Sequence, residues 1–164
     1  MITLDERLKA CAEYVSGKGT VCDVGTDHAY LPAYLILSEK CRNAVAGDIN
    51  DGPLEFAEQT LNKYKLSDKI KLVKSDGLKN ISPENVSDVI IAGMGGETIS
   101  DILAEAEWLR NGVNLILQPM TRAQGLRKWL YKNGYEIISE RAVSHDRFNY
   151  TVINASYCGY RFNI

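Results

Sequence analysis

The chain has 164 residues, of which 45% are apolar and 24% charged, and its formal net charge is −2. These values are typical of one globular domain with a substantial core, and they exclude a disordered, collagenous or low-complexity chain. No apolar run approaches the ~20 residues of a membrane span, and residues 1–7 lack a signal-peptide pattern. We therefore expect a cytoplasmic protein without a membrane partner.

Cysteine and histidine usage indicates no metal site. The four cysteines are irregularly spaced and form no C-x-x-C pair, and His28 and His145 are far apart. We expect reduced, mostly buried thiols and no bound metal.

The charge is unevenly distributed along the chain. Residues 1–109 carry 11 Lys and Arg against 18 Asp and Glu, whereas residues 110–164 carry 8 against 3. A basic C-terminal third is compatible with a polyanionic partner, and equally with an ordinary solvated surface.

Helices alternate with short apolar strands along the chain. Thr3 and Glu6 form a capping box ahead of a first amphipathic helix that ends near Gly17. We then expect a strand at 20–24, a helix at 32–38, a strand at 43–49, a helix at 51–64 capped by Asp51, and a strand at 70–73.

The alternation continues and closes on two strands. The pattern predicts a strand at 88–92, a helix at 99–106, a strand at 113–117 broken by Pro119, a helix around 126–130, and strands near 135–143 and 148–155. Such a chain folds as α/β, with a mostly parallel sheet, helices on both faces and an antiparallel strand at one edge. Ligands of such sheets bind outside the carboxyl ends of the strands, near the point where strand order reverses.

The first strand carries Asp23 next to its last residue and is followed by Gly25, Asp27 and His28. Gly25 permits a tight turn beneath a ligand. The segment is not G-x-G-x-x-G, and a carboxylate at Asp27 repels a diphosphate, so a dinucleotide is disfavoured and a cationic ligand is favoured. The alternative is a loop in which Asp27 only caps the next helix.

Acidic residues also follow the second and third strands. Asp48 lies 23 residues after Gly25, an offset at which an acid can accept hydrogen bonds from a ribose. Asp76 and Gly77 follow the third strand, where a carboxylate can accept from an adenine amine. Taken singly, each is equally compatible with a helix cap or an ordinary turn.

The fourth and fifth strands end in glycines and in an amide. Gly93, Gly95 and Gly96 indicate the close approach of a ligand or of another backbone, and Gln118 offers both a donor and an acceptor beside Pro119. The strand ends together describe an acidic nucleoside site without a phosphate clamp. S-adenosylmethionine, which has adenine, ribose and a positive sulfonium, fits this description better than ATP does.

These residues resemble the bacterial tRNA (adenine-22-N1)-methyltransferases, over nearly the whole chain. The resemblance rests on four segments: Asp23–Pro32 (DVGTDHAYLP), Ala46–Pro53 (AGDINDGP), Ile90–Gly96 (IIAGMGG) and Leu115–Pro119 (LILQP). It implies a Rossmann-like class I methyltransferase fold with a seven-stranded sheet and one antiparallel strand. It also implies a methyltransferase domain over 1–164, without the C-terminal helical domain that family members usually have.

The resemblance implies the following roles for residues of this chain. S-adenosylmethionine, with S-adenosylhomocysteine as product, would be bound by Asp23, Gly25, Asp27, His28, Asp48, Ile49, Asp76, Gly77, Gly93, Met94 and Gly95. Asp27, Tyr30 and Gln118 would serve the transfer to adenine N1, with Asp27 stabilising the cationic product ring and Tyr30 stacking on the extruded base. Many family members have Asn after Gln-Pro, where this chain has Met120.

The expected macromolecular partner is tRNA. Arg122, Arg127, Lys128 and Lys132 lie on or beside the helix after Pro119 and are candidates for phosphate contacts. Two alternatives stay open: a class I methyltransferase with another nucleic acid or a small molecule as substrate, and a non-catalytic nucleic-acid-binding module.

Overall fold

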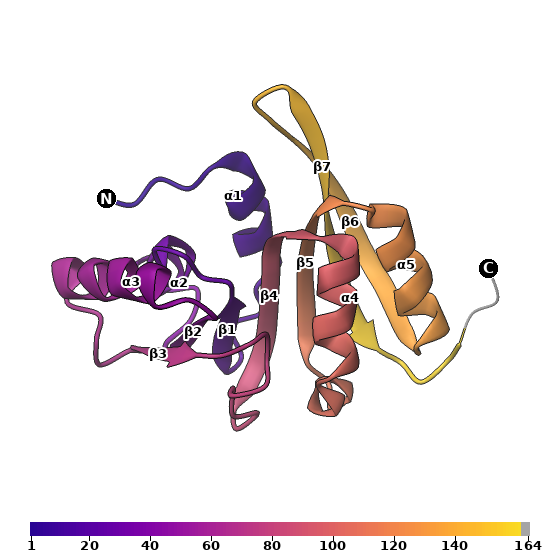
Figure 1. The fold of residues 1–164 in the computed structure, drawn as a ribbon, viewed down its shortest axis with the longest axis horizontal. Helices are drawn as coiled ribbons and strands as arrows, with labels where there is room; N and C mark the ends of the chain where they lie inside the picture. Colours follow the sequence, from indigo (N-terminus) through magenta and orange to yellow (C-terminus); the bar gives the residue numbers. More distant parts are fainter. Residues whose placement is uncertain (162–164) are drawn as a thin grey trace.

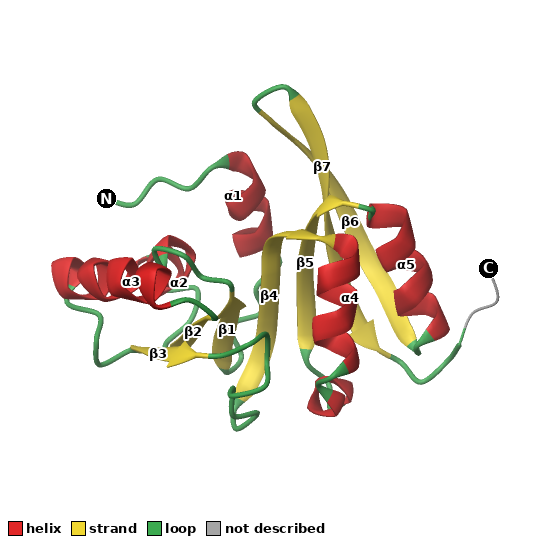
Figure 2. Cartoon of the chain, viewed as in Figure 1, coloured by secondary structure: helices red, strands yellow, loops and turns green. Residues whose placement is uncertain are grey.

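A computed structural model describes residues 1–161 of the chain. In chain order the elements are α1 (Glu6–Glu13), β1 (Thr20–Val24), α2 (Tyr30–Leu37), β2 (Ala44–Asp48), α3 (Asp51–Tyr64), β3 (Ile70–Lys74), β4 (Val86–Gly95), α4 (Gly96–Ala104), the 3-10 helix η1 (Glu107–Arg110), β5 (Asn114–Thr121), α5 (Ala123–Lys132), β6 (Tyr135–His145) and β7 (Phe148–Tyr157). Helices and strands alternate along most of the chain, except that β4 follows β3 without an intervening helix, and the chain closes on the two strands β6 and β7 (Figure 2).

The described strands form one sheet in the order β3-β2-β1-β4-β5-β7-β6. The pairs from β3 through β5 are parallel, whereas β7 runs antiparallel to both of its neighbours, β5 and β6. The mostly parallel, seven-stranded Rossmann-like sheet with one antiparallel strand is thereby confirmed. The expectation that this strand lies at the edge is wrong, because β7 inserts between β5 and the edge strand β6. Strand order reverses between β1 and β4, which lie side by side at the centre (Figure 1).

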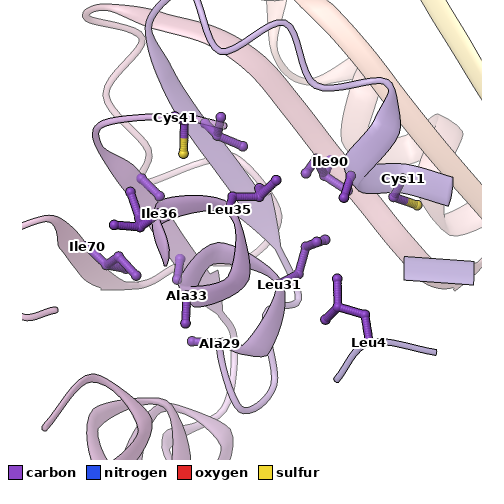
Figure 3. Packing of buried hydrophobic residues seen from close by; sticks show 14 of the residues in the cluster. Leu4, Cys11, Ala29, Leu31, Ala33, Leu35, Ile36, Cys41, Ile70 and Ile90 are labelled. Carbon is purple, nitrogen blue, oxygen red and sulfur yellow. The ribbon is translucent and has the colours of Figure 1, made fainter. Parts of the chain in front are cut away.

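Alternate residues of the central strands enter two separate apolar clusters. In β4, Ile90 packs in a cluster with buried residues of α1, α2 and α3, and Ile91 packs with those of α4 and α5. Figure 3 shows part of the first cluster, in which Leu31 and Leu35 of α2 point toward Ile90. Because successive strand residues point to opposite faces, continuous apolar strands such as 89–91 can fill both clusters.

The expected capping box of the first helix is wrong. The N-cap is Asp5, whose Oδ1 accepts a hydrogen bond of 2.9 Å from the Leu8 amide, and α1 begins at Glu6. The expected cap of α3 is also wrong, because Asn50 holds that position and Asp51 is the first helical residue. Asp51 pairs instead with Lys74 at 3.0 Å. In both cases the expected residue is of a type that can cap a helix, but the N-cap position lies one or two residues away from it.

Two strands extend further than the sequence pattern indicated. β4 continues through the glycine-rich segment to Gly95, and β5 continues through Pro119 to Thr121. Pro119 does not break β5, because β7 pairs only with Leu115–Leu117 and the register with β4 shifts near Met94. A residue without an amide hydrogen is tolerated beyond the regular ladder.

A buried carboxylate fastens the opposite, amino-terminal edge of the sheet. Asp88 of β4 is fully buried. Its oxygens accept hydrogen bonds of 2.7 to 3.2 Å from the backbone amides of Ser16 and Gly17, the hydroxyls of Ser16 and Ser87, and the side-chain amide of Asn114. The loop after α1 is therefore tied to β4 and β5, which holds α1 across the sheet.

Candidate functional site

The turn after β1 opens a depression at the carboxyl edge of the sheet. Gly25, Asp27 and Ala29 have φ angles of 71°, 54° and 59°, and the amides of Gly25 and Thr26 both donate to the Gly47 carbonyl at 2.9 Å. This left-handed turn leads the chain away from the strand end before α2 begins at Tyr30. The expected start of that helix at Pro32 is two residues too late, because Ala29 supplies the turn.

One cavity lies at the ends of β1, β2 and β3, and we name it the β3-side cavity. Its volume is about 490 Å³. It is lined by Val24, Gly25, Asp48, Ile49, Asn50, Ser75, Asp76, Gly77, Lys79, Met94, Thr98, Asp101, Ile102 and Glu105. Gly25, Asp48, Ile49, Asp76, Gly77 and Met94, named from the sequence, are brought together here.

Asp48 is fixed by the loops on both sides of it. Its Oδ2 accepts from the Asp27 amide at 3.2 Å, and its Oδ1 accepts from the Asn50 amide at 3.1 Å. The side chain is buried among protein atoms yet lines the cavity. Each oxygen retains acceptor capacity, so a ribose bearing two vicinal hydroxyls can bind here.

Asp76 and Gly77 form the rim of the same cavity. The exposed Asp76 carboxylate pairs with Lys79 at 2.9 Å, and Lys79 also approaches Glu105 at 3.5 Å. Gly77 has a φ of 58°, and a Cβ on it would lie 3.0 Å from Ile102. A side chain at this position would therefore crowd Ile102.

A second, smaller cavity lies between α1 and the β1 turn, and we name it the α1-side cavity. Its volume is about 240 Å³. It is lined by Arg7, Leu8, Asp23, Gly25, Thr26, Asp27, His28, Tyr30, Leu31, Ala92 and Gly93. Gly25 lines both cavities, so the two adjoin at the turn after β1.

Asp23 is the most deeply buried carboxyl group of the α1-side cavity. Burial raises the pKa of Asp23 to about 7, and the neighbouring Asp48 carboxylate adds to the rise. A cationic group beside Asp23 favours its ionised form.

Arg7 is a site residue that the sequence interpretation missed. Its Nη1 donates to Gln118 Oε1 at 2.7 Å, and its Nη2 pairs with Asp5 at 3.0 Å. Within the described residues its buried Nε has no hydrogen-bond partner. The local sequence carried no signal for this role, because the contact with Gln118 spans 111 residues of sequence.

Gln118 is fully buried beneath this arginine. Its Oε1 accepts from Arg7 and, at 3.0 Å, from the Gly93 amide, while its Nε2 donates to the Pro119 carbonyl at 3.1 Å. The Met120 sulfur lies 3.5 Å from Arg7 Nη1. Gln118 thereby orients Arg7 and the end of β4, rather than facing the cavity itself.

The three glycines at the end of β4 and the start of α4 serve two different purposes. Gly93 has a φ of 78° and faces Arg7, whereas a Cβ on Gly96 would collide with the Arg122 carbonyl. Gly95 approaches Thr121, with 3.1 Å from a built Cβ to its hydroxyl. The first glycine thus borders the cavity, and the other two allow the approach of the β5 backbone.

Asp27, His28 and Tyr30 stand at the mouth of the α1-side cavity. The Asp27 side chain is 71% exposed and lies 3.1 Å from His28 Nδ1. Tyr30 is 47% exposed, and its ring stacks on His28 with centroids 5.1 Å apart. Both a carboxylate and an aromatic face are accessible where a substrate would enter.

The basic residues on and beside α5 are spread along the whole length of the helix. Arg122 precedes the helix beside the end of β5, and the ten-residue α5 carries Lys132 about 15 Å away along its axis. Arg127 is engaged by Glu140 at 2.6 Å and by Gln124 at 3.1 Å. Of this group, Arg122 lies nearest the cavity mouth.

Two further observations concern the described residues 1–161. No group of three or more His, Cys, Asp or Glu side chains in this range is placed to hold a metal ion. In the same range no helix has the length and apolar character to cross a membrane.

Residues 4–153 match the methyltransferase domain family, and the chain belongs to this family. It is 39% identical over 155 residues to the tRNA (adenine(22)-N(1))-methyltransferase of Bacillus subtilis (strain 168), and the alignment covers 94% of this chain and 65% of that enzyme. The chain therefore spans just under two thirds of the length of that curated relative.

Solved structures agree closely in fold. The crystal structure of the B. subtilis M1A22 tRNA methyltransferase TrmK superposes with a TM-score of 0.92 at 38% identity, covering 98% of this chain and 69% of that one. M. capricolum TrmK in complex with S-adenosyl-homocysteine gives a TM-score of 0.87 at 32% identity, covering 98% and 72%.

Proposed function

We propose that this chain is the catalytic domain of an S-adenosylmethionine-dependent methyltransferase that modifies N1 of adenine 22 in tRNA. The observation that carries the proposal is the pair of cavities that adjoin at Gly25, with Asp48 at one end and Asp23 and Arg7 at the other. The relatives named as tRNA (adenine(22)-N(1))-methyltransferases support the substrate.

The residues present fit S-adenosylmethionine. The β3-side cavity suits the nucleoside, with the ribose on Asp48 and the adenine between Ile49 and the rim at Asp76 and Gly77. Gly25 leaves open the passage that a side chain would fill, and Met94 borders the pocket from β4.

The α1-side cavity suits the amino-acid end of the cofactor. Asp23 and Asp27 complement its ammonium and sulfonium charges, and the Arg7 guanidinium complements its carboxylate. The buried Arg7 Nε, which has no hydrogen-bond partner among the described residues, is a polar group that a ligand can satisfy.

The bound cofactor supplies an electrophilic methyl carbon: as the N1–carbon bond forms, the carbon–sulfur bond breaks and leaves its electron pair on sulfur. N1 of adenine has a free lone pair, so the protein needs no strong base. The Asp27 carboxylate stabilises the positive charge that develops on the ring, and Tyr30 stacks on the base. His28 orients Asp27, and Gln118 positions Arg7. Positioning supplies much of the acceleration.

The tRNA must present adenine 22 outside its stack, because N1 lies on the Watson–Crick edge. Arg122, Lys128 and Lys132 supply positive charge from the cavity mouth along α5, and Arg127 contributes after exchanging its contact with Glu140. We place this activity in the cytoplasm, where tRNA is the partner.

The methyltransferase domain extends over 1–164, of which 162–164 lie outside the described residues. Helices on both faces of the sheet are supported by the two apolar clusters, one with α1 to α3 and one with α4 and α5. The matched relatives are longer, since the alignment covers 65% of the B. subtilis enzyme.

The test is mass spectrometry of a tRNA transcript after incubation with the protein and S-adenosylmethionine. We expect one added methyl group, located at N1 of adenine 22 in nuclease fragments, and none in a transcript with guanine at that position. Methylation of both transcripts at another base would favour a different nucleic-acid substrate. Cofactor binding without any transfer to tRNA would favour a small-molecule methyltransferase.

A further inference from the structure

A third cavity adjoins the reaction mouth on the side of α3, and we name it the aromatic hollow. Its volume is about 530 Å³. Its lining includes Thr3, His28, Tyr30, Phe56, Gln59 and Lys63. It shares His28 and Tyr30 with the α1-side cavity, so the two cavities are neighbours.

Three aromatic rings form a continuous stack between these cavities. His28 lies in the middle, with its centroid 5.1 Å from Tyr30 and 4.7 Å from Phe56 at interplanar angles of 15° and 25°. Tyr30 and Phe56 are about half exposed, at 47% and 49%. Exposed aromatic faces are the usual platforms for unstacked nucleic-acid bases.

The charge of the hollow complements an anion. Lys63 is exposed, and its Nζ lies 5.3 Å from the centroid of the Tyr64 ring. No Asp or Glu belongs to the lining formed by the described residues. The polar groups of Thr3 and Gln59 add hydrogen-bonding capacity to the same wall.

We propose that the aromatic hollow binds a single unstacked nucleotide of the RNA substrate, close in the strand to the adenine that is methylated. Its base stacks on Phe56 and its phosphate contacts Lys63, while the target adenine occupies the other side of Tyr30. This inference rests on the proposed function, and it adds a second nucleotide subsite to the reaction mouth.

The arrangement favours a polynucleotide over a free small molecule. The hollow and the α1-side cavity share His28 and Tyr30, so two bases joined by one backbone can lie on either side of these rings, one in the hollow and one at the mouth of the α1-side cavity. Capturing the neighbouring nucleotide also helps to keep the target base out of its stack, since the strand is then held on both sides of the extruded adenine.

The kinetic test uses the full 164-residue chain and two substitutions, Phe56→Leu and Lys63→Gln. We expect the KM for tRNA to rise about 5- to 20-fold in each, with kcat and the Kd for S-adenosylmethionine changed less than twofold. Phe56→Trp, which retains a stacking face, should restore the wild-type KM. Leu37→Ala and Lys71→Gln, exposed residues of α2 and β3 outside the hollow, are the matched controls.

A binding test keeps the inference separable from the proposed activity. A heptaribonucleotide with adenine at its centre is titrated into the ¹⁵N-labelled, S-adenosylhomocysteine-saturated protein. We expect the addition of RNA to change the amide chemical shifts of residues 56–64, and we expect these changes to be absent in Lys63→Gln. If the wild type methylates no tRNA, the proposed function fails, and these shifts still decide whether the hollow binds RNA. Unchanged amides at millimolar RNA, or a KM for tRNA equal to that of the controls, would overturn the inference.

Discussion

Arg7 in the first turn of α1 and Gln118 near the end of β5 are joined by a hydrogen bond of 2.7 Å across 111 residues of sequence. Gln118 also accepts from the Gly93 amide, so one side-chain oxygen links α1 to β4 and β5 at the site. The Arg7 guanidinium lies 5.9 Å from the Tyr150 ring of β7 and pairs with Asp5. The first helix therefore contributes a fixed positive charge to a cavity otherwise dominated by carboxylates.

Arg7→Met should weaken S-adenosylmethionine binding by about 10- to 100-fold, since a charge-assisted hydrogen bond contributes roughly 1.5–3 kcal/mol. Calorimetry measures this directly. 5′-Methylthioadenosine lacks the amino-acid carboxylate, so its affinity should be unchanged. Lys9→Met on the exposed side of α1 is the control. Equal losses for both ligands would mean that Arg7 acts on the fold rather than on the carboxylate.

Gly25→Ala should reduce cofactor affinity by more than tenfold. A Cβ at this position would lie 2.5 Å from Met94 Cε, and the φ of 71° is unfavourable for alanine. The double variant Gly25→Ala with Met94→Ala separates the causes, because it removes the collision with Met94. We expect affinity to stay low, because the added methyl group still enters the passage between the cavities. Full recovery would show that only protein packing required the glycine.

The clustering of the residues at the strand ends was predictable, because parallel strands bring their carboxyl ends to one edge of the sheet regardless of loop conformation. Asp48, Asp76 and Gly25 therefore line a common cavity, as the sequence pattern indicated. Arg7 was not predictable in this way, because its role depends on how α1 crosses the sheet. That crossing is fixed by long-range contacts, including those of Asp88 with Ser16 and Asn114.

The same distinction holds for Gln118. A polar residue at a strand end suggested a group facing the substrate, whereas its hydrogen bonds run to Arg7, Gly93 and Pro119. Local sequence identifies a side chain able to donate and accept, but only packing determines which neighbours it satisfies. The pairing of Arg127 with Glu140 on β6 has the same origin, since helix periodicity carries no information about the adjoining strand.

Cofactor affinity should rise with pH up to about 7. Burial holds the pKa of Asp23 near 7 in the free protein, and the cationic end of the cofactor favours the ionised carboxylate, so binding releases a proton below that pH. Binding titrations between pH 5.5 and 7.5 should show that cofactor affinity increases by up to about tenfold per pH unit below the pKa of Asp23. Asp23→Asn should bind more weakly and show no such slope; a slope that persists in this variant belongs to another group.

The contribution of Asp23 to folding stability depends on pH in the opposite direction, because it decreases as the pH rises. Its pKa rises from an ordinary value of 3.8 to about 7, so between these values the folded state keeps a proton that the unfolded state has lost. The stabilisation is complete below about pH 3.8 and is lost as the pH rises to 7. Urea unfolding of the wild type and of Asp23→Asn at pH 4.5 and 7.5 should therefore differ more at the higher pH, in favour of the variant.

Asp88→Ala should lower the free energy of unfolding by about 3–5 kcal/mol, the range for removing one partner of a buried charged network. Five donors lose their acceptor, among them two backbone amides after α1. Denaturant unfolding provides the measurement. Asp68→Ala, at an exposed position near the same edge of the sheet, should change stability by less than about 0.5 kcal/mol. A loss below 1 kcal/mol for Asp88→Ala would mean that these hydrogen bonds are replaced by water.

Charge substitutions along α5 should affect tRNA binding in order of distance from the site. Arg122→Glu, beside the end of β5, should weaken tRNA binding most, and Lys132→Glu, about 15 Å away along the helix axis, should weaken it least. Loss of one phosphate contact should also make the slope of log affinity against log salt shallower by about 0.7–0.9. Arg127→Gln tests the middle of the helix without placing a second carboxylate beside Glu140. Filter binding at several salt concentrations, with S-adenosylhomocysteine affinity as the control, measures the series. Equal effects at all positions would indicate a non-specific electrostatic surface, and no effect at Arg122 would exclude the mouth of the cavities as the tRNA entry.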